Sequence, residues 1–220
     1  MRIVSVNVGL PRDLPHRDGV VESGIVKGPV EGPVAVGRTN LAGDGQADLS
    51  VHGGPDKAVY AYPHEHYAAW ARELGRGDLE PGRFGENLTL EGVLEDEARI
   101  GDTLRAGTAL LEVSQPRVPC FKLAIRMGDP AFARPFLRSG RTGFYLRVLE
   151  EGEVRAGDPV ARVHEARDSM SVREVAALLG EGASPEALDR GAALACLPLG
   201  WRESFARRAI AARERARRAR

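Results

Sequence analysis

The stretch LEVSQPRVPCFKL, residues 111–123, joins an extended run to a short helical one and places a cysteine between them. Its first part has the apolar pattern of a strand, and its last part begins a helical turn or two that Gly128 ends. Pro116 and Pro119 cannot donate to a strand ladder, and each disfavours helix in the residue before it. We therefore expect an ordered, non-repetitive loop that displays Cys120.

Two features of this loop favour the thiolate form of Cys120. The thiol would lie near the amino end of a short helix, whose unpaired N–H groups carry partial positive charge, and Arg117 and Lys122 add cationic charge. A thiolate attacks electrophiles or binds metals, whereas a lone cysteine in other surroundings often fills a gap in the core. The prolines and cations make Cys120 the leading candidate for chemistry.

The composition excludes several classes of protein. A chain of 220 residues can hold one sizeable domain plus an appendage, or two small domains. Lysine plus arginine and aspartate plus glutamate balance at 31 each, so no global field attracts nucleic acid or an anionic membrane. From Gly200 onward, however, eight arginines stand against two glutamates. This run resembles a nucleic-acid-binding tail, but its interleaved alanines also suit a solvated helix end.

Cysteine usage and the amino terminus indicate the compartment. The two cysteines, Cys120 and Cys196, lie in regions of different character, which argues for free thiols in a reducing environment. The first residues, MRIVSVNVGLPRD, lack the apolar length of a signal peptide or a membrane span. We expect a cytoplasmic protein. Lysine is nearly absent beside arginine, which we attribute to genome composition rather than function.

Short strands and turns dominate the first three quarters of the chain. Residues 1–10 alternate apolar and small polar side chains, and residues 19–37 repeat valine, glycine and proline with little helical period. Gly-Asp pairs at Gly101 and Gly157 each separate two strand-like runs, which predicts hairpins. Together these features favour a curled antiparallel sheet or barrel.

Helices are expected at few places in this part. The clearest, residues 63–74, has apolar side chains at helical spacing and is followed by Gly75 as a stop. His64 and His66 would lie about 200° apart on it, so they cannot chelate one metal ion as an i, i+4 pair could. We interpret both as surface or capping histidines.

The character of the chain changes near Arg167. The motif SVRE, residues 171–174, is a capping box that opens one helix, and Ser184 with Pro185 opens a second. A third is expected from about Trp201. We therefore predict two domains, residues 1–166 and residues 167–220, with the second a small three-helix domain in which Cys196 belongs to the core.

Polar, glycine-bounded loops are the remaining candidates for a site. Residues 37–62 contain His52 and Lys57 between turn formers, and residues 81–92 display Glu86 and Asn87. The loop SGRTG, residues 139–143, offers Arg141, Thr142 and backbone amides that could hold a phosphate, although it could equally be a plain connection.

Five segments in a fixed order resemble one known family. They are residues 43–67 (GDGQADLSVHGGPDKAVYAYPHEHY), 81–89 (PGRFGENLT), 100–102 (IGD), 111–123 (LEVSQPRVPCFKL) and 139–149 (SGRTGFYLRVL). In this order they resemble the MOSC family, named for the carboxy-terminal domain of molybdenum cofactor sulfurases, and within it the YiiM-like proteins with a carboxy-terminal three-helix domain. The resemblance implies a mainly β, α+β fold, with a closed or partly open barrel.

The resemblance also implies a cofactor and a reaction. The cysteine that matches Cys120 is the protein ligand to molybdenum held by molybdopterin, and soft sulfur suits that metal. Relatives reduce N-hydroxylated compounds such as 6-N-hydroxylaminopurine to amines, which needs a two-electron couple that side chains lack. Since neither iron–sulfur cysteines nor a flavin motif are visible, electrons would come from a separate donor protein.

The other site residues are hypotheses. His52, Asn87 and Arg117 would border the metal or the pterin, and Lys57, Arg141 and Thr142 are candidates for the cofactor phosphate. His52 or Glu86 would relay the proton that the departing hydroxyl needs.

Two alternatives to the reductase stay open. Cys120 could carry a persulfide or passively hold the cofactor in a non-enzymatic carrier, or the arginine-rich carboxy terminus could bind nucleic acid. Homo-oligomerisation is left open, and we expect no membrane partner.

Overall fold

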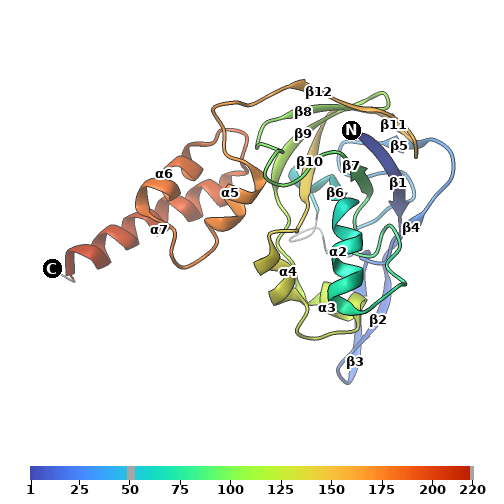
Figure 1. Cartoon of the computed structure of the whole chain (residues 1–220), viewed down its shortest axis with the longest axis horizontal. Coiled ribbons are helices and arrows are strands. Elements are labelled where there is room, and N and C mark those ends of the chain that lie inside the picture. Colours follow the sequence, from blue (N-terminus) through green and yellow to red (C-terminus); the bar gives the residue numbers. More distant parts are fainter. Residues whose placement is uncertain (49–52, 219–220) are drawn as a thin grey trace.

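The computed structural model describes residues 1–48 and 53–218. Eight strands form the large sheet, and two pairs of short strands flank it (Figure 1). In spatial order the large sheet contains β12 (Val160–His164), β8 (Thr103–Ala106), β9 (Ala109–Pro116), β10 (Phe144–Glu150), β6 (Val59–Pro63), β7 (Leu88–Glu91), β1 (Arg2–Val8) and β4 (Gly28–Pro29). The short pairs are β2 (Arg12–His16) with β3 (Gly19–Ser23), and β5 (Val34–Val36) with β11 (Gly152–Val154).

The large sheet curls into a partly open barrel. Neighbouring strands are antiparallel except for the parallel pair β6–β7. The turn before β12 reaches round to β1, where the backbone N–H of Ile3 donates to Asp158 O at 2.9 Å and that of Gly157 donates to Ile3 O at 2.8 Å. The predicted α+β fold with a closed or partly open barrel is confirmed in its partly open form.

The predicted Gly-Asp hairpins are wrong. Gly101 and Gly157 do take left-handed turn conformations, with φ of 93° each, but the strands on either side of them do not pair. β11 pairs with β5, whereas β12 pairs with β8. At Gly157 the chain passes from the small sheet of β5 and β11 to the large sheet that contains β12. A glycine turn signal indicates only that the chain changes direction, so it cannot distinguish a hairpin from a connection between two sheets.

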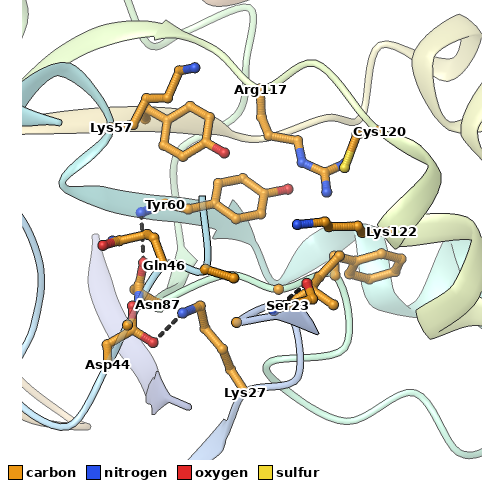
Figure 2. A pocket seen from close by; sticks show the side chains of 17 residues that line it. Ser23, Lys27, Asp44, Gln46, Lys57, Tyr60, Asn87, Arg117, Cys120 and Lys122 are labelled. Carbon is orange, nitrogen blue, oxygen red and sulfur yellow. Dashed lines mark hydrogen bonds and ion pairs between the residues drawn. The ribbon is translucent and has the colours of Figure 1, made fainter. Parts of the chain in front are cut away.

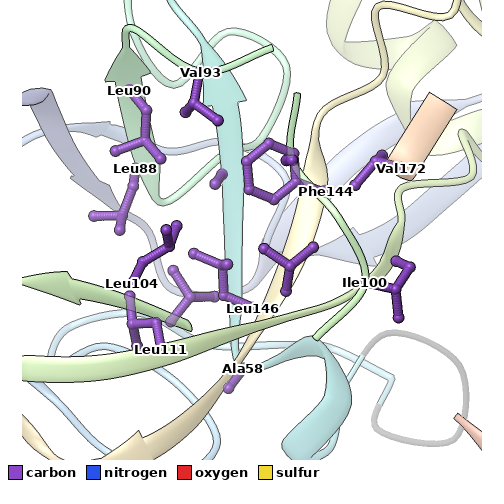
Figure 3. Close-up of a cluster of buried hydrophobic side chains, with 14 of the residues drawn as sticks. Ala58, Leu88, Leu90, Val93, Ile100, Leu104, Leu111, Phe144, Leu146 and Val172 are labelled. Carbon is purple, nitrogen blue, oxygen red and sulfur yellow. The ribbon is translucent and has the colours of Figure 1, made fainter. Parts of the chain in front are cut away.

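Two apolar clusters lie on opposite faces of the sheet. Alternation along β6 sends Val59 and Ala61 into the larger cluster and Tyr60 and Tyr62 into the smaller, aromatic one. Figure 3 shows part of the larger cluster, including Leu104 of β8 and neighbouring strands. The aromatic cluster is covered by α2 (Glu65–Leu74), α3 (Phe121–Met127) and α4 (Ala133–Ser139).

The predicted helices are present where their caps indicated. α2 ends at Gly75, whose φ of 60° places it in the left-handed conformation. α5 (Val172–Ala177) opens with the full reciprocal capping box of Ser171 and Glu174, and α6 (Pro185–Ala193) is capped by Ser184. The third, α7 (Leu199–Arg218), begins two residues before Trp201 and is 20 residues long. No helix within residues 1–48 and 53–218 combines the length and apolarity that a membrane span requires.

The carboxy-terminal helices share the larger apolar cluster with the sheet. Met170, Val172, Leu197 and Phe205 belong to the same group of buried side chains as the strand residues. Figure 1 shows α5 beside the sheet and α6 and α7 farther out. The proposed boundary at residue 167 therefore divides segments that share one core.

Candidate functional site

A cleft opens beside Cys120. Its walls come from segments far apart in the sequence, and Figure 2 shows their side chains converging. The segments are residues 23–27, residues 44–47, Lys57 with Tyr60, residues 84–87 and the junction between β9 and α3. Tyr145 of β10 completes the wall. Polar loops and the outer face of the sheet thus meet at the cysteine.

Cys120 is the residue immediately before α3. Its backbone is extended (φ −115°, ψ 174°), and its carbonyl oxygen accepts from the N–H of Leu123 at 3.0 Å. The side chain is partly exposed at the cleft. The predicted loop between a strand and a short helix is confirmed, since β9 ends at Pro116 and α3 ends at Gly128 (φ 71°). Cys196 instead packs against the larger apolar cluster, and neither cysteine forms a disulfide.

Among the described residues, four cationic side chains line the cleft, namely Lys27, Lys57, Arg117 and Lys122. Arg117 is only 5% exposed, and its guanidinium carbon lies 5.4 Å from the ring centre of Tyr60. Its Nη1 is buried and has no hydrogen-bond partner among the described residues. A buried donor without an acceptor costs free energy, and an anionic ligand that accepted from Nη1 would remove that cost. Arg117 is therefore suited to bind an anion.

A buried carboxylate holds one wall of the cleft together. Asp44 accepts hydrogen bonds from the backbone N–H of Gly9 at 3.0 Å and from Asn87 Nδ2 at 2.9 Å, and it pairs with the ammonium of Lys27. Asn87 in turn accepts from the backbone N–H of Tyr60 at 3.0 Å through Oδ1. Asn87 thus lines the cleft, while its amide fastens the loop to β6.

Glu86, the neighbour of Asn87, faces away from the cleft. Its carboxylate accepts from the backbone N–H groups of Gly82 at 2.8 Å and Phe84 at 3.1 Å, from the hydroxyl of Thr89 at 3.0 Å, and from that of Tyr67. Burial raises the pKa of Glu86, and these donors oppose that shift. The structure does not bring Glu86 together with Cys120. Glu86 instead holds the loop that presents Gly85 and Asn87.

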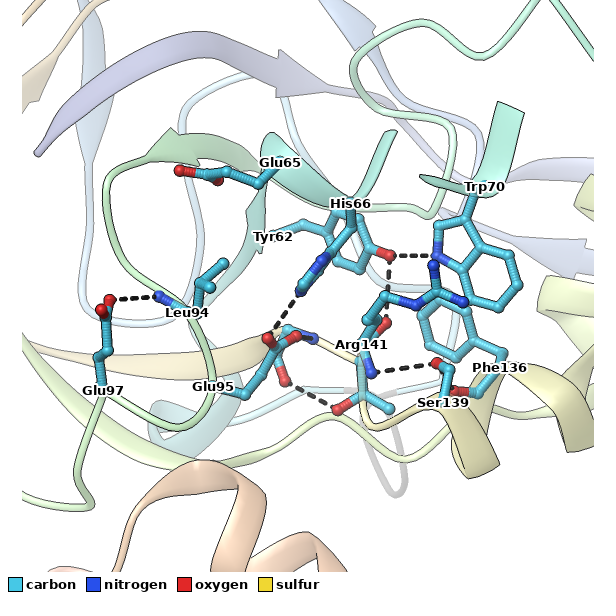
Figure 4. Close-up of polar contacts among 12 residues, drawn as sticks. Tyr62, Glu65, His66, Trp70, Leu94, Glu95, Glu97, Phe136, Ser139 and Arg141 are labelled. Carbon is cyan, nitrogen blue, oxygen red and sulfur yellow. Dashed lines mark hydrogen bonds and ion pairs between the residues drawn. The ribbon is translucent and has the colours of Figure 1, made fainter. Parts of the chain in front are cut away.

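Arg141 and Thr142 also lie outside the cleft. Arg141 Nη2 donates to Glu73 at 2.6 Å, and its guanidinium carbon lies 4.0 Å from the ring centre of Trp70. Figure 4 shows Arg141 beside Trp70, among residues of α2 and α4. Thr142 is fully buried and its hydroxyl donates to Gly143 O at 3.2 Å. The side chains of this loop therefore do not meet Cys120.

The histidines have different outcomes. His52 lies outside the described residues. His66 is buried and pairs with Glu95 at 2.7 Å, so its interpretation as a surface or capping histidine is wrong (Figure 4). The sequence conceals this pair because Glu95 is 29 residues away and is brought to α2 only by the fold. Glu95 also accepts from the backbone N–H of Gly143 at 2.7 Å, which fixes the start of β10.

Sequence reasoning missed Lys27 and the tyrosines of the cleft, whereas Asp44 belongs to the polar loop region that the sequence did indicate. No motif surrounds Lys27, and Tyr60 and Tyr145 look like ordinary strand residues. Their convergence depends on the pairing of β6 with β10, in which Tyr60 lies opposite Tyr145. The rarity of lysine in the chain is the sequence signal that could have drawn attention to Lys27.

Several carboxy-terminal arginines have partners within the chain. Arg208 Nη2 donates to Gly180 O at 2.7 Å, Arg202 Nε donates to Ala192 O at 3.2 Å, and Arg213 pairs with Asp189. These guanidinium groups fasten α7 to the preceding helices, which favours a structural role for this part of the basic run.

Known proteins resemble this chain in sequence and in structure over most of its length. The protein YflK of Bacillus subtilis is 41% identical over 204 residues, covering 92% of each chain. The crystal structure of YiiM from Geobacillus stearothermophilus superposes with a TM-score of 0.80 at 38% identity, covering 94% of this chain and 98% of that one. A protein of Gibberella moniliformis named "Reductase" is 38% identical over 160 residues, 71% of this chain but 28% of its own length.

The family model supplies the boundaries of the shared domain. The MOSC domain model matches residues 48–161, which include Lys57, Asn87, Arg117 and Cys120 and span the sheet from β6 to the start of β12. By sequence and by fold, the chain belongs to the MOSC domain family.

Proposed function

We propose that this protein is a molybdenum-cofactor-dependent reductase that removes oxygen from N-hydroxylated compounds and yields amines. The observation that carries the proposal is a partly exposed cysteine in a cleft with four cationic side chains, in a member of the MOSC family. The family name relates the domain to molybdenum cofactor sulfurases, and one relative is named a reductase.

The residues of the cleft fit the cofactor. Thiolate sulfur is a suitable ligand for molybdenum, and Cys120 supplies it at the cleft wall. The buried, unpartnered Nη1 of Arg117 calls for an acceptor such as a phosphate oxygen. Lys57 and Lys122 add cationic charge to the same space. When bound there, the cofactor would supply the two-electron redox chemistry that side chains lack.

In this proposal the residues of the cleft have separate roles. Cys120 would anchor the reacting centre, and Arg117 and Lys57 would hold the anionic part of the cofactor. Asn87 would keep its loop in place through Asp44 and Tyr60. Arg141 and Thr142 are left out of the phosphate site because their side chains lie elsewhere. Electrons would come from a separate donor protein.

Metal analysis tests the anchor. Protein made in a host that synthesises the cofactor should contain about one molybdenum per chain, and Cys120→Ser should lose it. Cys196→Ser is the matched control, since this second cysteine packs against the apolar cluster away from the cleft, and it should keep the metal. Equal molybdenum in the wild type and Cys120→Ser would contradict the assignment of Cys120.

An assay of the loaded protein tests the reaction. With a chemical reductant, the wild type should convert 6-N-hydroxylaminopurine to adenine, and Cys196→Ser should do so at a similar rate. Bound molybdenum without turnover of several N-hydroxylated substrates would contradict the reductase. Metal-free protein that carries a removable extra sulfur on Cys120 would instead favour the carrier.

A further inference from the structure

All the lysines of this protein meet in one place. The chain contains 28 arginines and 3 lysines, and the three lysines, Lys27, Lys57 and Lys122, all line the cleft beside Cys120. They come from three separate parts of the chain: the segment before β4, the turn before β6, and α3. Genome composition explains why lysine is rare. It does not explain why the remaining lysines converge on one cleft.

Lysine offers this cleft something that arginine cannot. Where the protein needs a solvated positive charge, it uses arginine, as it does along α7. The guanidinium of arginine stays charged at every accessible pH, whereas the compact ammonium of lysine can release its proton when it is buried. A cleft that retains lysine in an arginine-rich chain is therefore suited to proton transfer.

Lys27 is the lysine of the cleft that a buried carboxylate holds in position. Its side chain is 7% exposed and pairs with Asp44, which is 1% exposed. Asp44 is itself fixed by Gly9 and Asn87, so the carboxylate holds the ammonium in position. An ammonium has three N–H donors, and the pairing with Asp44 leaves donors for a ligand in the cleft.

The surroundings of Lys27 make its proton easier to release. Burial lowers the pKa of Lys27, while the negative charges of Asp44 and Glu86 oppose that shift. Burial likewise lowers the pKa of Lys57. A proton donor is most effective when its pKa lies near the working pH, so the direction of the shift suits an acid. The other titratable or charged groups that line the cleft are Lys57, Tyr60, Arg117, Cys120, Lys122 and Tyr145.

We propose that Lys27 is the proton donor of the cleft and protonates the oxygen that leaves when the N–O bond of the substrate breaks; this assignment rests on the proposed reductase function. The substrate R–NH–OH takes up two electrons and two protons and yields R–NH₂ and H₂O. Lys27 gives one proton to the departing oxygen, and water supplies the other to nitrogen and then reprotonates Lys27. An external one-electron reductant, such as a reduced viologen dye, supplies the two electrons in two equivalents.

The role differs from the two proton relays suggested by the sequence. Glu86 faces away from the cleft with its oxygens occupied by donors within the protein. His52 lies outside the described residues. It is the competing candidate for the proton donor, and the variant His52→Gln tests it in the kinetic experiment.

A direct titration tests the lysine without any turnover. Protein labelled with ¹⁵N at the lysine side chains should give three signals, and Lys27→Arg identifies one of them by its loss. That signal should titrate below the ordinary lysine value of about 10.4. Asp44→Asn should lower it further, since the carboxylate stabilises the ammonium. A Lys27 signal that titrates at or above the ordinary value overturns the assignment.

The kinetic experiment uses the cofactor-loaded protein and a reduced viologen dye. Lys27→Arg keeps the charge beside Asp44 but cannot donate a proton near neutral pH, so kcat should fall about 100-fold or more, with the molybdenum content unchanged. In the wild type, kcat should decline as pH rises through the pKa of Lys27, and Lys27→Arg should lack that decline. Lys57→Arg and Lys122→Arg should keep it.

A double variant controls for loss of activity that is caused by misfolding. Lys27→Met leaves the carboxylate of Asp44 buried without its cation, whereas Lys27→Met with Asp44→Asn removes both charges. This double variant should fold, bind molybdenum and lose activity as Lys27→Arg does.

Failure of the proton donor and failure of the reductase are distinguishable. If the wild type reduces the N-hydroxylated substrate and Lys27→Arg is fully active, only the role of Lys27 is overturned. The same holds if the decline of kcat with pH disappears in His52→Gln but persists in Lys27→Arg. A molybdenum-loaded wild type without any turnover overturns both.

Discussion

At the scale of single residues, Gly143 shows how closely the tyrosine wall of the cleft is packed. Its φ of 67° lies in the left-handed region, and a Cβ added there would lie 2.4 Å from Ala61 O. The same Cβ would lie 2.8 Å from the ring of Tyr60 and 2.9 Å from that of Tyr62. Backbone and rings would have to move together to admit a methyl group.

Gly143→Ala should therefore destabilise the protein by about 2–4 kcal/mol, because strain of the backbone adds to the overlap with buried rings. The measurement is the free energy of unfolding in urea. Gly77→Ala is the matched control, since Gly77 has no positive φ and its added Cβ meets no atom within 4 Å. The control should change stability by less than about 0.5 kcal/mol. Equal effects of the two substitutions would contradict the packing argument.

At the scale of elements, Arg147 joins three parts of the fold. From β10 it donates to Asp56 Oδ1 at 2.8 Å through Nε and at 2.6 Å through Nη2, and it pairs with Glu112 of β9. Nη2 also donates to Cys196 O at 3.3 Å, in the segment between α6 and α7. Asp56 precedes Lys57, so one guanidinium connects a wall of the cleft to the carboxy-terminal helices.

Arg147→Met should lower the free energy of unfolding by about 1.5–3 kcal/mol, because two carboxylates lose charged hydrogen bonds at a half-buried site. Arg105→Met is the matched control. Arg105 lies on β8 and pairs with Glu150 at an exposed position, where an ion pair contributes about 0–1 kcal/mol. Urea titrations of both variants give the comparison, and a larger loss in Arg105→Met would exclude the connecting role of Arg147.

At the scale of the whole molecule, the shared apolar cluster makes the carboxy-terminal helices part of the main core. Phe205 of α7 is 1% exposed and belongs to the cluster that contains the inner strand residues. We therefore expect residues 1–166 and 167–220 to unfold together, although they differ in secondary structure. Cooperative unfolding follows when one segment cannot be removed without exposing the core of the other.

The two tryptophans of the chain report on the two regions separately. Trp70 lies in the aromatic cluster, and Trp201 packs against the larger cluster in α7, with its ring centre 5.7 Å from that of Phe205. Trp201→Phe and Trp70→Phe each leave one reporter. Within each variant, fluorescence and circular dichroism should give the same urea midpoint. An earlier midpoint for Trp201 fluorescence would show that the helices unfold independently.

The sequence by itself determined those features that depend on short-range chemistry. Gly75 and Ser171 define helix ends through left-handed backbone and capping hydrogen bonds, and Pro116 and Gly128 bound the segment around Cys120. The ordered MOSC segments indicated the family, which the comparisons confirmed. The helix-end and loop signals act within a few residues, so no tertiary contact is needed to interpret them.

Only the tertiary structure decided which polar groups meet at Cys120. Glu86 and Asn87 are adjacent in the sequence, yet one is held beneath its loop while the other lines the cleft. Arg141 stacks on Trp70, whereas Lys27, which no motif marked, reaches the cleft beside Asp44. The physical reason is that strand register and sheet curvature determine the direction of each side chain, and a shift of one residue reverses it.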